Sequence, residues 1–449
     1  MSAADLTGFW IVDVCAQQGL AAALCAAARL SYVVWVPPHD PNGLSVLPTT
    51  MPVSGIPVDF ILFCLTLLGV ALLHRHTLPV ALAGLAVITA YKLIFTGFRD
   101  GGGLTGLGLH VTHEFSLLAN LFLLLVGFAL LSRHFEESAL PDAMPRLLPD
   151  NWTGGVLLLA IVFVLSGFLD NIAAAIIGGT VARHVFGGKV HIGYLAAIVA
   201  ASNAGGAGSV LGDTTTTMMW VAGISPLSVV EAYLAAFIAL LFFAVPASLQ
   251  QQRHSPIDKK VHRLLSFDWM RVAIVAAMLI AVVAANVVTN LYLPELLGRV
   301  PVLGLTLWLV VLATVPLRRP DWRVLPGAVK GAIFLVALVT AASMMPVDTL
   351  PAASWQTTLG LGFVSSVFDN IPLTALALKQ GGYDWGYLAY AVGFGGSMIW
   401  FGSSAGVALS NQYPEAKSVG RWLRHGWHVG VAYVIGFFVM LALLGWHPE

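Results

Sequence analysis

The sequence predicts an all-α, polytopic membrane protein. Of its 449 residues 58% are hydrophobic, only 10% are charged, and the mean hydropathy is +0.85. A soluble domain carries about 25% charged residues, so an ordinary soluble protein is excluded. The net charge is zero and no basic cluster alternates with aromatic residues, which excludes a nucleic-acid binder. The three cysteines, Cys15, Cys25 and Cys64, form neither a disulfide framework nor a metal-ligand motif.

Ten apolar segments are candidates to cross a bilayer, which takes about 20 residues. Residues 1–50 are apolar in part but interrupted by polar side chains, so an extra span, an interfacial helix and a mispredicted start all remain open. The ten segments are 57–73, 78–97, 112–131, 190–223, 226–248, 271–293, 301–316, 326–345, 385–410 and 425–446.

Two further apolar stretches, 153–186 and 353–381, each carry an Asp-Asn pair near the middle. The pairs are Asp170-Asn171 and Asp369-Asn370. A charged residue at the centre of a span costs at least about 2.5–3.5 kcal/mol. One long helix with a buried charge is one solution. We favour a re-entrant helical hairpin, because its tip holds the polar pair inside protein or a water-filled cavity.

The distribution of basic residues supports the re-entrant hairpins. Cytoplasmic loops carry an excess of Lys and Arg. When both hairpins are re-entrant, the basic loop at 251–270 and the loop at 317–326 fall on the cytoplasmic side together. Reading either hairpin as a single span misplaces the neighbouring loops. Three basic residues, Arg99, Arg299 and Lys379, then fall on the external side. Arg29 and Lys92 stay unassigned.

The two halves of the chain repeat the same unusual motifs. SGFLDNI at 166–172 corresponds to SSVFDNI at 365–371, and a glycine-rich segment follows each motif. The first hairpin enters from inside and the second from outside, so the repeats have opposite topology, as in secondary transporters with a midplane site. The glycines that match at a constant offset are Gly205, Gly206 and Gly212 with Gly395, Gly396 and Gly402. The first repeat is expected at 51–250, with hairpin 153–186 and broken helix 190–223. A cytoplasmic linker follows at 251–270. The second repeat is expected at 271–449, with hairpin 353–381 and broken helix 385–410.

The expected site combines hairpin tips with glycine-interrupted helices. Freed carbonyls, amide oxygens, hydroxyls and a carboxylate together make a set of hard oxygen ligands that suits a small cation. No Lys or Arg is placed at the midplane, so a cation is favoured over a multiply charged anion. Three carboxylates in one low-dielectric space cannot all ionise, and a carboxylate that exchanges a proton for a cation is the minimal chemistry of antiport. The candidate ligands are Asp170, Asn171, Asn203, Asp213, Thr214, Asp369, Asn370 and Ser403, with Na+ expected at Asp170, Asn171, Asn203 and Asp213.

These motifs resemble those of the NhaD-type sodium/proton antiporters of the ion transporter superfamily, over about residues 57–446. The resemblance is carried by the Asp-Asn hairpin, by NAGGAGS from Asn203, and by GDTTTTMMW from Gly212. It implies exchange of cytoplasmic Na+ or Li+ for external H+ at the inner membrane. It also implies a homodimer with a scaffold domain and an elevator-like transport domain, and no cofactor. The second half departs from the pattern, because Gly393 stands opposite Asn203 and Ser403 opposite Asp213.

Two other functions remain as alternatives. The same superfamily contains citrate and dicarboxylate carriers, so Na+- or H+-coupled uptake of a carboxylate is the second hypothesis. His110, His113 and Glu114 form a small polar cluster at an outer helix end, which could be a proton entry, a metal site or an interfacial anchor. A membrane protease is disfavoured because the sequence has no HExxH motif. We therefore expect a transporter and not an enzyme.

Overall fold

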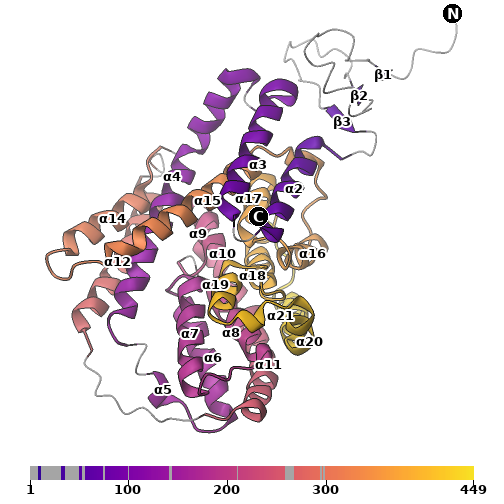
Figure 1. Ribbon diagram of the computed structural model, residues 1–449. Coiled ribbons are helices and arrows are strands. Elements are labelled where there is room, and N and C mark those ends of the chain that lie inside the picture. The colour runs from indigo at the N-terminus through magenta and orange to yellow at the C-terminus, as the bar shows by residue number, and fades with distance from the viewer. Residues whose placement is uncertain are drawn as a thin grey trace, which may run out of the picture. The chain divides into compact units, whose positions relative to one another are not determined.

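The computed structural model describes residues 9–11, 32–35, 50–52, 56–73, 76–99, 101–140, 144–209, 211–257, 267–293, 296 and 299–449. Three residues named above, Cys15, Cys25 and Arg29, lie outside this part, as do residues 258–266 of the predicted linker. From residue 56 onward the described chain is helical apart from turns and one isolated bridge, as the sequence predicts (Figure 1).

The N-terminal segment contains three short strands. Strands β1 (Phe9–Ile11), β2 (Tyr32–Trp35) and β3 (Thr50–Pro52) form an antiparallel sheet in this order. Phe9 pairs with Trp35, and Tyr32 with Pro52. β1 and β2 are made almost wholly of aromatic and β-branched residues, which favour strands. The sheet was not among the structures expected for residues 1–50.

The chain divides into two compact units, the first comprising Met1–Glu114 and Thr340–Thr349. It contains α2 (Val58–Leu72), α3 (Thr77–Tyr91) and a π-helix, η2 (Lys92–Thr96), that continues α3. Lys92 is buried, and its Nζ lies 3.4 Å from Oδ1 of buried Asp59 in α2. The charge of Lys92 is thus paired with that of Asp59 inside the unit. Lys92 therefore does not mark a loop on either side of the membrane. The remaining elements are the start of α4 (Gly103–Glu136), the last four residues of α15 (Leu325–Ser343) and a 3-10 turn, η5 (Val347–Thr349).

The second unit, Phe115–Val339 and Leu350–Glu449, contains the two hairpins and both interrupted helices. Its first-half helices are α5 (Met144–Leu147), α6 (Trp152–Ser166), α7 (Asn171–Val185), α8 (Ile192–Ala207), α9 (Thr214–Val221), α10 (Pro226–Val230) and α11 (Ala232–His254). Its later elements are α12 (Trp269–Tyr292), α14 (Val302–Thr314), η4 (Trp322–Val324), α15 (Leu325–Ser343), α16 (Trp355–Ser365), α17 (Asn370–Gln380), α18 (Trp385–Gly395), α19 (Ser404–Gln412), η6 (Pro414–Ala416), α20 (Val419–His425) and α21 (Trp427–Leu444).

Six helices of the described chain are long and apolar enough to cross a membrane. They are Thr77–Thr96, Gly103–Glu136, Pro226–His254, Trp269–Thr289, Trp322–Ser343 and Trp427–Leu444. The shorter apolar helices Val58–Val70, Trp152–Ser166, Ile192–Ala207 and Val302–Thr314 add to this apolar framework. The prediction of a polytopic helical membrane protein is therefore confirmed.

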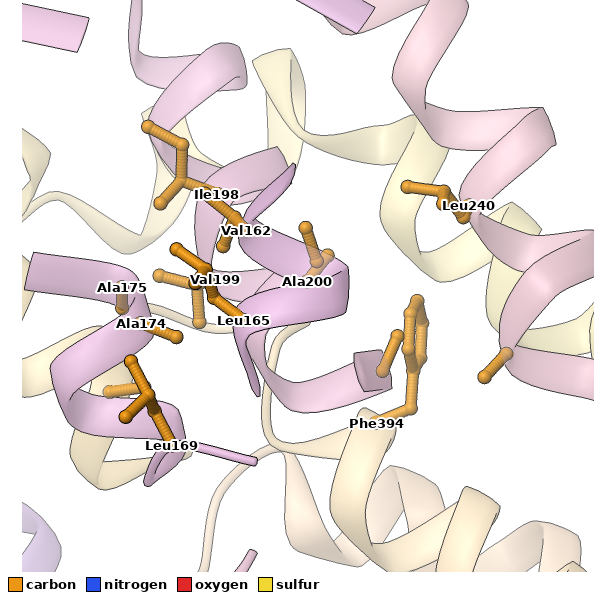
Figure 2. Packing of buried hydrophobic residues seen from close by; sticks show 14 of the residues in the cluster. Val162, Leu165, Leu169, Ala174, Ala175, Ile198, Val199, Ala200, Leu240 and Phe394 are labelled. Atoms are coloured by element: carbon orange, nitrogen blue, oxygen red, sulfur yellow. The ribbon is translucent and has the colours of Figure 1, made fainter. Parts of the chain in front are cut away.

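Helix α8 forms the centre of the second unit. Every residue from Gly193 to Ala207 is buried, as expected for a helix surrounded by others. It packs against α6, α7, α11 and α18. Figure 2 shows Ile198 and Val199 of α8 among Val162 and Leu165 of α6 and Ala174 of α7. The C-terminal end of α8, where the chain leaves the helix, is therefore buried inside this unit.

The glycine-rich segments pack against the hairpins in the same way in both halves. A Cβ at Gly205 would collide with the carbonyl oxygen of Phe163, and one at Gly395 with that of Gly362. The breaks repeat this relation: a Cβ at Gly212 or Gly402 would collide with the carbonyl oxygen of Ser166 or Ser366. Only glycine allows such close backbone contacts. The motif repeat is thus also a repeat of packing, whereas the opposite orientation of the repeats stays a prediction.

Candidate functional site

Each Asp-Asn pair lies at the turn between the two helices of its hairpin. Asp170 occupies the N-cap position of α7, and Asn171 is its first residue. Asp369 occupies the same position before α17, where its Oδ1 accepts a hydrogen bond from the Ile371 amide at 3.1 Å. Asp369 is therefore a true helix cap, whereas Asp170 makes no side-chain cap hydrogen bond.

The first interrupted helix ends at Ala207 and resumes at Thr214, with Asp213 as the N-cap residue of α9. The break is held by local hydrogen bonds: Thr216 and Thr217 each donate to the Asp213 carbonyl oxygen at 2.9 Å. The Ser209 hydroxyl donates to the Gly167 carbonyl oxygen at the turn of the first hairpin. Gly205 and Gly206 lie in the last turn of α8, and Gly212 lies in the break itself. The predicted helix interruption is confirmed.

The Asp213 carboxylate is the centre of a buried polar network. Asn171 Nδ2 donates to Asp213 Oδ1 at 3.0 Å and to Asn203 Oδ1 at 3.2 Å. Asn370 Nδ2, from the second hairpin, lies 3.4 and 3.3 Å from the two Asp213 carboxylate oxygens. All four side chains are buried. The structure thus brings together four predicted residues from both halves of the chain.

Two serines of the second half complete this network. Asn203 Nδ2 donates to Ser397 Oγ at 2.9 Å and to Ser403 Oγ at 3.1 Å. Ser403 caps α19 by accepting the Gly406 amide at 3.2 Å. Both contacts use the amide nitrogen of Asn203, so its oxygen faces Asn171. Ser397 was not predicted, because its counterpart in the repeat is Ala207, which carries no polar signal.

Asp369 makes a separate contact beside this network. Its Oδ2 accepts a hydrogen bond from Ser404 Oγ at 3.1 Å. Ser404 was also missed, although the repeat could have identified it, since Ser404 corresponds to the predicted ligand Thr214. Gly395 ends α18, Gly396 is its C-cap residue, and Gly402 lies in the second break.

A cavity of about 260 Å³ opens beside the network and lies entirely within the second unit. Its polar lining consists of Asp170, Asn171, Asp213, Thr214, Thr217, Asn370 and Ser404. Asp170 is partly exposed there, while Asp213 is buried. The described residues that line the cavity include no Lys, Arg or His. Its polar surface is therefore anionic, which suits a cation.

The His110 cluster lies in the first unit. Nε2 of buried His110 is 3.0 Å from Ser343 Oγ, and its ring stacks on Phe98 with centroids 5.8 Å apart. His113 is exposed. No group of three or more His, Cys, Asp or Glu side chains in the described chain is arranged to hold a metal ion. The geometry of His110 is that of a packed core histidine.

No protein-family model matches this chain. It is similar to two proteins of Arabidopsis thaliana: "Sodium/proton antiporter 2", 28% identical over 55% of this chain and 66% of the relative, and "Sodium/proton antiporter 1", 28% identical over 56% and 48%. The chain thus spans about half to two thirds of the length of these plant relatives. It is also 27% identical to "Na(+)/H(+) antiporter NhaD" of Vibrio cholerae, over 82% of this chain and 87% of the relative. These similarities confirm the resemblance to NhaD-type antiporters.

Proposed function

We propose that this chain is a secondary active transporter that exchanges cytoplasmic Na+ or Li+ for external H+. The observation that carries the proposal is the buried Asp213 carboxylate, contacted by Asn171 and Asn370 beside an anionic cavity. A carboxylate binds either a proton or a metal cation at a given oxygen. Loading one therefore releases the other, and this competition couples the two fluxes.

The asparagines supply the ligands that a bare carboxylate lacks. An Asn side chain offers an oxygen acceptor on one side and an NH2 donor on the other. In the arrangement described here, Asn171 and Asn370 present NH2 groups to the Asp213 carboxylate. Rotation of the Asn171 amide by half a turn presents its oxygen instead, while the Asn203 oxygen already faces the network. With Na+ bound, Asp170, Asn171, Asn203 and Asp213 would then form an oxygen cage of the kind hard cations prefer, completed by Thr214.

Asp170 acts as the second titrating group in this proposal. It lies one residue before Asn171 and faces the same cavity, which it shares with Asp213. Its partial exposure lets it receive a hydrated cation before the buried network does. Asp369 has a supporting role, because Ser404 and the start of α17 already hold its carboxylate.

The cavity does not favour citrate. A citrate carrier must neutralise several negative charges, and helix N-termini alone would have to do so here. The described lining instead holds Asp170 and Asp213 without a cationic side chain. The similarity to proteins named as sodium/proton antiporters points the same way.

The proposal extends to the molecule as a whole. We place the chain in the inner membrane as a homodimer without a cofactor, with two inverted repeats and an elevator-like transport domain. The span-length helices and the similarity to bacterial NhaD proteins support the location. Gly205 and Gly395 contact their own hairpins in the same way, and so do Gly212 and Gly402. These matched contacts support the repeats.

Proton flux in sealed vesicles tests the function. Purified protein is reconstituted into vesicles with an acid interior and a pH dye, and Na+, Li+, K+ and citrate are added singly. We expect Na+ or Li+ to make the interior alkaline. Asp213→Asn should abolish this response, whereas Asp348→Asn, at an exposed aspartate of the first unit, should not. Saturable citrate uptake without a cation response would overturn the proposal.

A further inference from the structure

The cavity beside Asp213 is much larger than a single ion requires. Its volume is about 260 Å³, whereas one water molecule takes about 30 Å³ in the liquid. In another protein an apolar cavity of about 150 Å³ is large enough to bind benzene. The available space therefore accommodates a ring together with a charged head group.

Most of the remaining lining is apolar and comes from two helices. Helix α4 contributes Leu124, Leu125 and Phe128, and helix α15 contributes Ala332 and Leu335. The polar lining comes from the hairpin tips and the helix breaks, that is, from other elements of the same unit. One cavity thus combines carboxylates with an aliphatic and aromatic surface. A monovalent inorganic cation has no use for that second surface.

Two glycines keep the α15 side of the cavity recessed. Gly327 and Gly331 are four residues apart in α15, so they lie on one face of the helix, and both line the cavity. A Cβ at either position would meet no atom within 4 Å. Packing therefore does not require glycine here, and glycine is unfavourable inside a helix. The result of these two residues is open volume next to the ion site.

We propose that this cavity binds an organic monocation, with an ammonium or guanidinium head at Asp170 and a flat apolar body against α4 and α15. Asp170 is the carboxylate that is partly exposed to the cavity, so it can pair with the head without disturbing the buried network. The apolar body loses contact with water on binding. Because the head occupies the approach to Asp213, the ligand competes with Na+; this competition rests on the proposed function.

Three small probes separate the charge from the apolar body. Benzylammonium, benzyl alcohol and methylammonium are titrated into purified protein in Na+-free detergent buffer, with binding measured by calorimetry. We expect benzylammonium to bind at least tenfold more tightly than either of the others. Equal binding of benzyl alcohol would mean unspecific partition, and equal binding of methylammonium would mean that the apolar wall takes no part. Either result overturns the proposal.

Matched variants place the site. Gly331→Leu fills the recess and should weaken benzylammonium binding at least tenfold. Gly360→Leu makes the same change at another helical glycine whose Cβ would meet nothing within 4 Å, outside the cavity lining, and should leave binding unchanged. Asp170→Asn, which keeps the shape of the side chain, provides a second test if Gly331→Leu folds poorly. Unchanged binding in Asp170→Asn, or in a folded Gly331→Leu, overturns the proposal.

Exchange measured on the same protein separates this inference from the proposed function. If benzylammonium binds with the variant pattern above but the wild type exchanges no Na+ for H+, the cavity inference stands and the antiport proposal fails. If exchange is normal and benzylammonium does not bind, the reverse holds. If both hold, raising Na+ should displace benzylammonium, and benzylammonium should inhibit exchange. Lack of displacement would overturn the inferred competition between benzylammonium and Na+.

Discussion

At the scale of single residues, the orientation of Asn203 decides what the site can bind. Its amide nitrogen is held by Ser397 and Ser403, so its oxygen is directed to the network around Asp213. An oxygen is a cation ligand and an NH2 group is not. The two serines that hold the Asn203 amide nitrogen thus select the ligand atom.

Ser397→Ala is expected to weaken Na+ dependence without abolishing exchange. One buried hydrogen bond contributes about 1 kcal/mol, which corresponds to a roughly fivefold higher Na+ concentration for half-maximal exchange. Ser410→Ala is the matched control, because Ser410 is equally buried but donates to the Gly406 carbonyl of its own helix at 2.6 Å. Exchange in vesicles over a range of Na+ concentrations measures the effect. Equal shifts in both variants would show that Ser397 does not orient Asn203.

The residues found from the sequence are those whose polar side chains interrupt an apolar run. Asp213, Asn171 and Asn370 stand out because a polar pair or a buried carboxylate interrupts an apolar run. Ser397 gave no such signal, since its counterpart is Ala207. The ion pair between Lys92 and Asp59 was also missed, because it depends on tertiary contact between α2 and the π-helix after α3.

At the scale of elements, the sequence predicted helix positions well where hydropathy is uninterrupted. Helix α15 begins within one residue of the predicted span, whereas α4 runs from Gly103 to Glu136 instead of 112–131. The additional turns contain His110 at the start and Arg133 at the end, which lower local hydropathy but fit a helix equally well. Hydropathy therefore locates the apolar middle of a helix and not its polar ends.

The close contact between α8 and α6 leads to a stability prediction. Gly205→Ala should destabilise the protein, because the new methyl group collides with the Phe163 carbonyl oxygen and overpacking costs about 1–3 kcal/mol. Gly420→Ala, in α20 where a Cβ meets nothing within 4 Å, should be neutral or stabilising by about 0.4–1 kcal/mol. Thermal unfolding followed by tryptophan fluorescence distinguishes the two. A Gly205→Ala protein as stable as the wild type would show that the helices are not in backbone contact.

The start of α8 is sensitive to pH. The Nδ1 atom of His191 accepts the Gly193 amide hydrogen bond at 3.2 Å, which requires a neutral ring. Burial, together with the neighbouring His425 and His254, lowers the pKa of His191 from 6.5 to about 4. Its folded pKa lies below the unfolded value, so unfolding takes up a proton between these values. Stability from this residue is complete above pH 6.5 and is lost as the pH falls toward 4.

His191→Asn tests this dependence, because Asn is a good N-cap that does not titrate. We expect the melting temperature of the wild type to fall more steeply between pH 6.5 and 4.5 than that of the variant. At pH 8 the two proteins should melt at similar temperatures. Parallel pH profiles would mean that protonation of His191 is not linked to unfolding.

At the scale of the whole molecule, the question is how the second unit is threaded through the membrane. Ion pairs join the end of α4 to the start of α12 and the loop after α14: Arg271 with Glu137 at 2.7 Å, and Arg318 with Asp268 at 2.8 Å. These ends must lie on one side of the bilayer. The predicted topology places all of them in the cytoplasm, on the side where the basic loops gather.

The same topology fixes the side of each hairpin end, and this can be tested directly. If the first hairpin is re-entrant, Asp150 before α6 and Lys189 after α7 both face the cytoplasm. If the second enters from outside, Ala352 faces the exterior. All three are exposed. In a background without Cys15, Cys25 and Cys64, each is changed to cysteine and labelled in intact cells with a membrane-impermeant maleimide.

We expect the maleimide to label Ala352→Cys in intact cells, and Asp150→Cys and Lys189→Cys only after permeabilisation. The reason is electrostatic as well as structural: re-entry leaves Asp170 at a hairpin tip inside the protein, whereas a single crossing would place its charge within a continuous span. A single crossing also puts Asp150 and Lys189 on opposite sides. Labelling of only one of these two from outside would therefore remove the re-entrant hairpin, and with it the inverted repeat on which the proposed ion site depends.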